Sequence, residues 1–109
     1  MTNEQKALNL LGMATRAGKL VSGEEQVIAA IQKGKVDVVI CVTDASSKTA
    51  AKLEDKCRYY DVDYIQGFTT ETLSNAIGKQ RSIVAIADKG FTKSIKKLFD
   101  LESENMHMK

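Results

Sequence analysis

The stretch EEQVIAAIQKGKVDVVICVT, residues 24–43, carries the pattern that decides the fold. Its first part places apolar residues on one face of a helix and ends at Gly34, a residue that commonly terminates helices. Its second part, residues 37–43, is a nearly continuous apolar run rich in valine and isoleucine. Such a run is typical of a strand that is covered on both faces. A helix followed directly by a doubly covered strand predicts an α/β protein.

The same alternation of helices and strands continues along the whole chain. Helical spacing of apolar residues recurs in residues 2–18, 46–60, 69–78 and 90–100, and short strand patterns occur in residues 19–22, 62–66 and 82–88. Together these elements predict a three-layer α/β/α sandwich, in which helices cover both faces of a small four-stranded mixed sheet.

Length and composition predict a single domain. A chain of 109 residues is long enough for one hydrophobic core, and it contains no repeat and no linker. We expect residues 1–100 to form the domain and residues 101–109, which are polar and lack periodicity, to form a flexible C-terminal tail. The predicted core consists of Leu11, Val27, Ile31, Val39, Ile40, Leu53, Ile65, Leu73, Ile77, Val84, Ile86 and Ile95.

Capping signals mark several helix ends. Thr2 with Gln5, and Ser22 with Glu25, have the spacing of a capping box, in which each of the two side chains bonds to the other residue's backbone N–H. Gly18 and Gly78 stand where the first and fourth helical patterns stop.

Charge and hydropathy exclude some classes of protein. The chain has 16 basic and 14 acidic residues, so its net charge is only +2 and any nucleic-acid-binding surface must be a local basic patch. Apolar runs are too short for a membrane span. The sequence MTNEQKALNL has neither a basic head nor a long hydrophobic stretch, so we expect no signal peptide, no membrane contact and a cytoplasmic location.

The cysteines point to a packing role. Cys41 lies in an apolar strand pattern and Cys57 on an apolar helical stripe, so both are interpreted as small core hydrophobes. Two distant cysteines and the single histidine, His107, do not make a zinc site. We expect the chain to fold without a metal, a cofactor or a disulfide.

Catalytic motifs are missing from the sequence. The segments LSNAIGKQ and MATRAGKL each contain a Gly-Lys pair, but neither fits a phosphate-binding loop, and a serine–histidine–aspartate triad would need His107 in the predicted tail. Asp44 and Asp88 each end a strand, and an enzyme acting on a small molecule through one of them is the weakest alternative. Capping of the helices that follow is the favoured role of both aspartates, and the protein is predicted not to be an enzyme.

Three stretches of the sequence, taken in order, resemble those of a known family. They are RAGKLVSGEEQVIAAIQKGKVDVVICVTDAS, KCRYYDVDYIQGFTTETLSNAIGK and SIVAIADKGF. Their order and spacing resemble the RNA-binding superfamily of the ribosomal proteins L7Ae and L30e over about residues 5–99. The details ATRAGKLVSGEEQV, DASSKT and AIGK look most like its bacterial YlxQ branch.

The resemblance implies both a fold and a ligand. The family fold is the same three-layer sandwich, and its usual ligand is a kink-turn, an RNA internal loop with a sharp bend and tandem sheared G·A pairs. Gly23 matches a glycine where backbone approaches RNA, Lys19 matches a phosphate-contacting lysine, and Glu25 and Gln26 match the base-reading pair. The implied RNA-binding residues are Arg16, Lys19, Gly23, Glu25, Gln26, Lys48, Gly67, Phe68 and Thr69, with Phe68 stacking on an unpaired base.

The chain departs from the archaeal pattern of the family at the base-reading positions. Archaeal members carry Asn-Glu and a lysine one turn later, whereas this chain has Glu25, Gln26 and Ala29. Glu25 repels phosphate but can accept from a guanine amino group, so either a weaker affinity or a different RNA is expected.

Each candidate residue also has a structural interpretation. Phe68 can equally be a buried loop anchor. Lys79 and Arg81 fit a solvated turn, and Tyr59 and Tyr60 fit partly buried helix residues better than a stacking platform.

These observations predict a non-enzymatic RNA-binding protein that recognises a structured, kink-turn-like RNA. The expected partners are such an RNA or ribosomal RNA, with the ribosome as a candidate, and a monomer is expected. The alternative is a protein-interaction module that has kept the fold and lost RNA binding. A basic rim around Arg16, Lys19 and Lys48 would favour RNA, and an exposed apolar patch in the same place would favour a protein partner.

Overall fold

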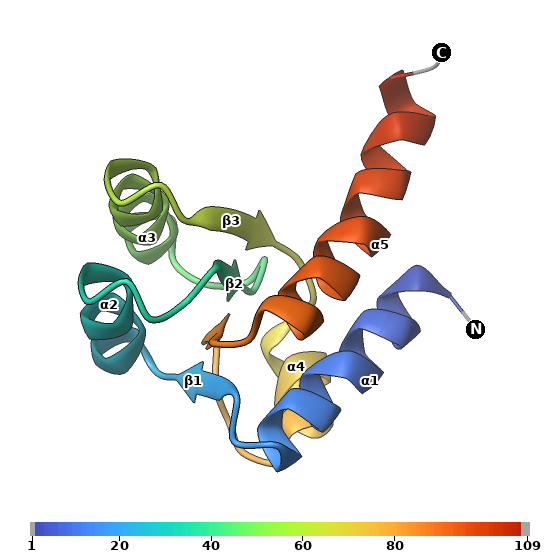
Figure 1. Ribbon diagram of the computed structural model, residues 1–109, viewed down its shortest axis with the longest axis horizontal. Coiled ribbons are helices and arrows are strands. Elements are labelled where there is room, and N and C mark those ends of the chain that lie inside the picture. Colours follow the sequence, from blue (N-terminus) through green and yellow to red (C-terminus); the bar gives the residue numbers. More distant parts are fainter. Residues whose placement is uncertain (1, 108–109) are drawn as a thin grey trace.

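A computed structural model describes the backbone of residues 2–107 and the side chains of residues 2–99 (Figure 1). Within these residues five helices alternate with four strands. In chain order the elements are α1 (Asn3–Arg16), β1 (Leu20–Ser22), α2 (Glu24–Gln32), β2 (Val38–Cys41), α3 (Ser47–Tyr59), β3 (Asp63–Gln66), α4 (Thr70–Ile77), β4 (Ile83–Ile86) and α5 (Lys89–His107).

The four strands form one mixed sheet in the order β1-β4-β2-β3. β4 runs antiparallel to both of its neighbours, β1 and β2, whereas β2 and β3 are parallel. The last strand of the chain therefore lies between the first and second strands. All residues of β2 and β4 are buried, as expected for strands covered on both faces.

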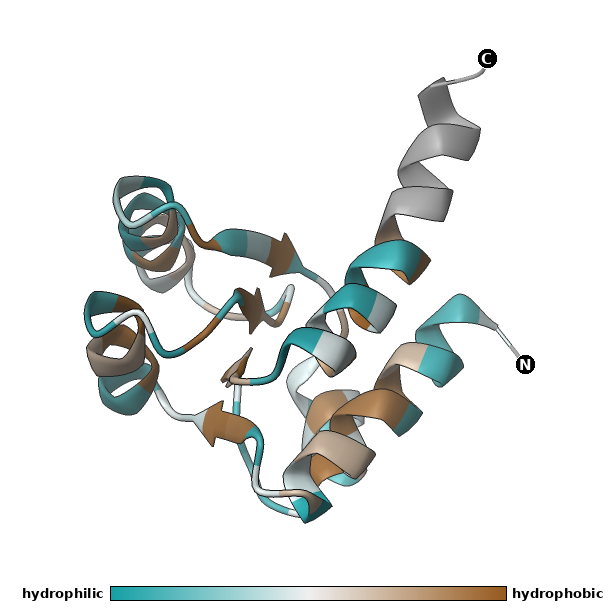
Figure 2. Cartoon of the chain, in the orientation of Figure 1, coloured by the Kyte–Doolittle hydropathy of each residue, from teal (hydrophilic) through white to brown (hydrophobic). Residues whose placement is uncertain are grey.

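Helices cover both faces of the sheet, which confirms the three-layer prediction. Side chains of α1, α4 and α5 pack with those of β2 and β4 into one apolar cluster. Side chains of α2 and α3 pack with the alternate residues of β2 and β4 into a second cluster. Figure 1 shows the two groups of helices on opposite sides of the sheet, and Figure 2 shows the hydrophobic residues concentrated on the strands and the sheet-facing sides of the helices.

The predicted core is confirmed except at one position. Of the twelve residues, eleven are buried, and Ile65 is only partly buried against the first cluster. Ile65 belongs to β3, which is an edge strand and therefore has a neighbouring strand on one side only. This position explains why its burial is incomplete.

The helix ends differ from the prediction at α2. Ser22 does not cap this helix; it is the last residue of β1 and is paired with Val84. The N-cap is Gly23, which has no side chain to offer, so the predicted Ser22–Glu25 capping box is wrong. Because Ser22 is paired in β1, the N-cap position falls on the next residue, Gly23.

The other predicted helix signals are largely confirmed. The Thr2 side chain accepts a hydrogen bond from the backbone N–H of Gln5, although the Gln5 side chain bonds to Asn9 instead of returning to Thr2. Gly18 and Gly78 both have positive φ immediately after a helix, as expected for helix-terminating glycines.

The helix α5 extends through His107, into the segment predicted to be a tail. A helical backbone over residues 101–107 was not expected from their polar, aperiodic sequence. The mobility of this segment and the domain boundary at residue 100 stay predictions.

Both cysteines are buried free thiols in the second cluster, which confirms their interpretation as core residues. Burial is also the main cause that raises the pKa of each thiol, and for Cys57, with the Asp63 and Glu54 carboxylates nearby, the pKa rises from 9.0 to about 11. Among the described residues, no group of three or more histidine, cysteine, aspartate and glutamate side chains could hold a metal ion. Every helix in this part of the chain is too short or too polar to cross a membrane.

The raised pKa of Cys57 predicts a pH-dependent contribution to stability. The folded state disfavours the thiolate, so the contribution is complete below pH 9 and is lost as the pH rises toward 11. We expect the difference in unfolding free energy between the wild type and Cys57→Ala to shrink by roughly 2 kcal/mol over this interval. Urea titrations at pH 8 and pH 11 measure this difference, and a value independent of pH would contradict the buried-thiol assignment.

Candidate nucleic-acid interface

One end of the sheet gathers most of the predicted functional segments. The carboxyl ends of β1, β2 and β3 and the amino end of β4 all lie there, because β4 is antiparallel to its neighbours. We call this the carboxyl end of the sheet, after the three strands that finish at it. Gly23 follows β1 and Gly67 follows β3, so both predicted contact segments start at this end.

Gly23 forms the base of a hollow at the amino end of α2. The hollow has a volume of about 390 Å³ and is lined by Ser22, Gly23, Glu24, Glu25, Gln26 and Arg81. Gly23 has φ 96° and ψ 144°, a conformation that is essentially restricted to glycine. Its N–H donates to the Ile83 carbonyl at 3.0 Å, which joins this turn to the first residue of β4.

Arg81 reaches this hollow from the turn between α4 and β4. Its Nε donates to the Ser22 hydroxyl oxygen at 3.3 Å, and its Nη1 donates to the Gln80 carbonyl at 2.7 Å. The backbone of Arg81 is held by Ser74, whose hydroxyl accepts from the Arg81 N–H at 3.0 Å. These bonds fix a cationic group beside Gly23, where the sequence interpretation expected only a solvated turn.

Two carboxylates stand on the α2 side of the hollow. Glu24 and Glu25 occupy the first turn of α2, where the helix dipole stabilises negative charge. Glu24 forms an ion pair with Lys52 of α3, with 3.0 Å between Oε2 and Nζ. Glu25 and Gln26 are both exposed, so their polar groups can reach a ligand.

Lys48 lies on the same side of the molecule as the hollow. It is exposed and stands four residues before Lys52 on α3, so the two lysines share a helix face. Because Lys52 touches Glu24 at the start of α2, Lys48 lies in the neighbourhood of the hollow.

Asp44 and Thr70 occupy the middle of this end of the sheet. Asp44 Oδ1 accepts from the Thr70 backbone N–H at 2.9 Å and from its hydroxyl at 3.0 Å. The bond from the Thr70 N–H is the largest cause that lowers the pKa of Asp44. Asp44 thus bonds to the first turn of α4, whereas Ser46 caps the next helix, α3. The prediction that Asp44 caps the following helix is therefore wrong.

The segment of residues 67–69 lies at the opposite edge of the sheet from Gly23. β1 and β3 are the two edge strands, so three strand spacings, about 14 Å, separate them. Thr69 is exposed and caps α4 through a reciprocal pair of bonds with Thr72, a role that was not predicted from the sequence. The structure therefore places these residues beside a different surface from that of Gly23.

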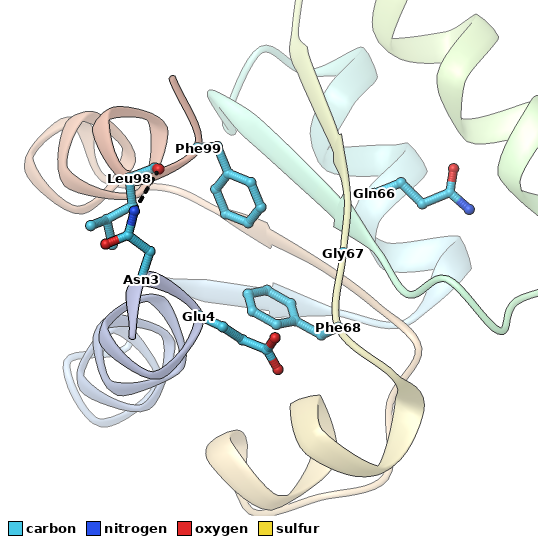
Figure 3. A pocket seen from close by; sticks show the side chains of 7 residues that line it. All are labelled: Asn3, Glu4, Gln66, Gly67, Phe68, Leu98 and Phe99. Atoms are coloured by element: carbon cyan, nitrogen blue, oxygen red, sulfur yellow. Dashed lines mark hydrogen bonds between the residues drawn. The ribbon is translucent and has the colours of Figure 1, made fainter. Parts of the chain in front are cut away.

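Phe68 is turned into the core. Its side chain is only 8% exposed, and its ring meets Phe99 edge to face with 6.0 Å between the ring centroids. Figure 3 shows both rings pointing into the space between α1 and α5, with Gln66 directed the other way. The stacking role expected for Phe68 is corrected to that of a buried loop anchor, because a buried ring has no free face for a base.

Arg16 and Lys19 lie away from the hollow. Arg16 is exposed in a groove between α1 and α4, beside Asn75 and Ala76. The Lys19 carbonyl accepts from the Ala87 N–H at 2.8 Å, so this lysine precedes β1 at the end of the sheet opposite Gly23. Arg16, Lys19 and Lys48 therefore do not form the single basic rim considered from the sequence.

The two strand-ending aspartates do not meet. Asp44 follows β2 and Asp88 follows β4, and these antiparallel strands finish at opposite ends of the sheet. Asp88 Oδ2 accepts from the Phe91 N–H at 2.8 Å and caps α5, as predicted. This separation removes the basis for a paired-carboxylate site.

Two further residues were misjudged from the sequence. Arg81 lines the hollow. The sequence signal that could have located it is its position just before β4, the strand that pairs with β1. Tyr59 was expected to be partly buried, but its side chain is 81% exposed because it lies at the outer end of α3.

Comparison with known proteins now identifies the family. A family profile matches residues 5–96, which include the hollow and nearly all of the sheet and its covering helices. The chain belongs to the ribosomal protein L7Ae/L30e/S12e/Gadd45 family.

Two relatives within this family share almost half of their residues with the chain. The RNA-binding protein YlxQ of Enterococcus faecium is 44% identical over 98 residues, covering 90% of this chain and 95% of the relative. The RNA-binding protein YlxQ of Bacillus subtilis (strain 168) is 45% identical over 92 residues, covering 84% and 92%.

Solved structures show the same L7Ae-type architecture. A Bacillus halodurans protein of unknown function has a TM-score of 0.85 and 42% identity, with 87% of this chain and 97% of that chain covered. The Giardia lamblia 15.5kD RNA binding protein has a TM-score of 0.77 with 88% and 83% covered, and at 17% identity it supports the fold alone.

The backbone of Gly23 predicts a specific cost of substitution. We expect Gly23→Ala to lower the unfolding free energy by about 1–3 kcal/mol, because the φ of 96° strains any side chain even though the space around it is open. Gly67→Ala is the control, since its Cβ would meet Phe99 at an ordinary distance of 3.4 Å. Equal unfolding midpoints for the two variants in urea would show that Gly23 is not strained.

Proposed function

We propose that the protein is a non-enzymatic RNA-binding protein that recognises a structured, kink-turn-like RNA through the hollow at the start of α2. The observation that carries the proposal is the convergence of Gly23, Gln26 and Arg81 on one open volume. Membership of the L7Ae/L30e family and the RNA-binding relatives at 44% and 45% identity support the same class of ligand.

The groups around the hollow suit a bent RNA with unusual base pairs. Gly23 has no side chain, so a phosphate or base edge can approach its backbone closely. The Gln26 amide offers both a donor and an acceptor to a G·A pair. Glu24 and Glu25 also line the hollow and repel phosphate, and Arg81 offsets this repulsion with a positive charge.

Contacts outside the hollow extend the proposed interface. Lys48 is placed to neutralise a phosphate on the α3 side. At the far edge of the same sheet end, the exposed Thr69 and the backbone of Gly67 remain available, whereas the ring of Phe68 does not take part. We assign these residues to a flanking stem rather than to the bend itself.

The polarity of the hollow favours RNA over a protein partner. Its lining is polar or charged apart from Gly23. Among the described residues, the exposed large hydrophobic side chains are Met13, Tyr59 and Tyr60, and none of them lines the hollow. An apolar docking patch, which the protein-interaction alternative needs, is therefore absent from the described part of this site.

The proposal extends to the setting in which the protein works. Ribosomal RNA, on the ribosome or during its assembly, is the proposed source of the bent RNA, and a monomer suffices because one chain forms the whole hollow. The two buried free thiols suit a reducing compartment, so we propose the cytoplasm.

Binding to a kink-turn RNA and to a straight duplex of equal length tests this function. We expect tighter binding to the kink-turn and a loss of about 1–3 kcal/mol for Gln26→Ala, from the missing base contact. Gln32→Ala is the matched control, because Gln32 is an exposed glutamine at the other end of α2. Equal affinity for both RNAs, or equal effects of the two variants, would refute recognition through the hollow.

A charge reversal at Glu25 separates the role in stability from the role in binding. We expect Glu25→Lys to lower the unfolding free energy by about 0.3–1 kcal/mol, because it puts a cation at the positive end of α2. The same change should raise kink-turn affinity by removing a repulsion from phosphate. Glu4→Lys, in the first turn of α1, should cost similar stability but gain less affinity. Equal gains at fixed salt would assign the effect to net charge alone.

The salt dependence of kink-turn binding counts the phosphate contacts. If the protein neutralises about three to five phosphates, log K should fall with log salt at a slope of about −2 to −4. Arg81→Gln should make the slope shallower by about one, since one contact is lost. A flat salt response would favour the protein-interaction alternative.

A further inference from the structure

The end of the sheet opposite the hollow carries a separate group of lysines. We call it the amino end, where β1, β2 and β3 begin and β4 finishes. Lys19 precedes β1, Lys35 precedes β2 and Lys89 follows β4, and all three are exposed. Four residue steps along β1, about 13 Å, separate Lys19 from Gly23, so this group is distinct from the hollow.

Backbone pairing places the three connections that carry these lysines next to one another. Lys19 bonds directly to Ala87 through its carbonyl, and Lys89 stands two residues after Ala87. The Asp37 N–H donates to the Ile86 carbonyl, and Lys35 stands two residues before Asp37. The three connections therefore leave adjacent strands, and the two strand spacings from β1 to β2 amount to about 10 Å. We call these three lysines the row.

Two of the four aspartates described at this end have bonding partners. Asp88 caps α5, and Asp63 forms an ion pair with Lys96, with 2.6 Å between Oδ2 and Nζ. Asp37 and Asp61 are the other acidic residues there. Lys33 and Lys93 add two more exposed cations beside the row, so positive charge dominates. The hollow differs, because there Glu24 and Glu25 oppose Arg81 and Lys52.

Helix stability accounts for only part of the row. The Lys19 and Lys35 N–H groups donate to the Ala14 and Ala30 carbonyls at 2.8 and 2.9 Å, so these lysines follow the C-terminal ends of α1 and α2, where the helix dipole favours a cation. Lys89 differs, because it is the first residue of α5, where the positive end of the dipole disfavours a cation. The position of Lys89 beside the other two connections therefore suits an anionic ligand.

We propose that Lys19, Lys35 and Lys89 form a second phosphate-binding surface, which takes the backbone of a double-stranded RNA segment. The choice of RNA as the polyanion rests on the proposed function. A duplex carries about one negative charge per 2 Å of its axis, so connections spread over about 10 Å face several phosphates. A protein with the hollow at one end of its sheet and this row at the other bridges two RNA segments.

The test compares two double variants in their affinity for a straight 20-base-pair RNA duplex. Lys35→Ala with Lys89→Ala removes two members of the row, and Lys6→Ala with Lys97→Ala removes the same charge from exposed positions on α1 and α5. At about 0.1 M salt, we expect the first pair to weaken duplex binding by about tenfold for each lysine, and the second pair to have a much smaller effect. Thermal unfolding of both variants checks that each is folded.

Three results would overturn the second surface. They are equal losses for the two pairs, no loss for either pair, and a loss seen with poly-L-glutamate but not with the duplex, which would assign the row to an acidic protein. The preference for a kink-turn over the duplex, and its dependence on Gln26, report on the hollow instead. The two proposals can therefore fail independently.

A second experiment tests bridging directly. Wild-type protein loaded with a fluorescent kink-turn RNA should be retained on the immobilised 20-base-pair duplex, and the Lys35→Ala/Lys89→Ala variant should lose most of this retention. Exclusion of the kink-turn by the duplex would show that both RNAs use one surface, and would overturn the bridging role.

Discussion

The structure depends on the burial of the two central strands, β2 and β4, on both faces. Every residue of both strands is buried, and their alternate side chains enter two separate apolar clusters. Burying a valine or isoleucine contributes about 1.5–3 kcal/mol, so each residue of these strands adds to stability on one face or the other. Each cluster needs the helices of its own face, and both clusters use residues of the same two strands, which links the three layers.

The antiparallel insertion of β4 between β1 and β2 organises the surface. It brings the turn before β4 to the same end of the sheet as the turn after β1, so that Arg81 meets Ser22 and Gly23 meets Ile83. The same insertion brings the turn after β4 to the other end, where Ala87 meets Lys19. One topological feature therefore assembles both candidate surfaces from residues distant in the sequence.

The two ends of the sheet differ in how they present charge. At the carboxyl end, Glu24 is ion-paired with Lys52, and the proposed recognition depends on the backbone at Gly23, the Gln26 amide and Arg81. Such a site favours shape and base edges over general attraction to phosphate. At the amino end, exposed lysines outnumber the carboxylates, which suits the proposed sequence-independent binding of an RNA duplex. A small net charge of +2 is thus compatible with the two proposed RNA contacts, which differ in kind.

The sequence by itself determined the layers, the core and the family. Apolar periodicity identified every helix and strand, because burial on one face of a helix or on both faces of a strand leaves a local pattern. Of the twelve core residues that it predicted, eleven are buried in the structure. Only the tertiary structure decided which functional residues meet. The predicted capping box at Ser22 is absent because strand pairing with Val84 places that residue in β1. Phe68 lies inward, where its ring meets that of the partly buried Phe99 edge to face. Lys19 and Gly23 are only four residues apart, but they lie at opposite ends of the sheet because the extended strand β1 separates them. Arg81 is distant from Gly23 in the sequence but lies beside it, because β4 pairs with β1.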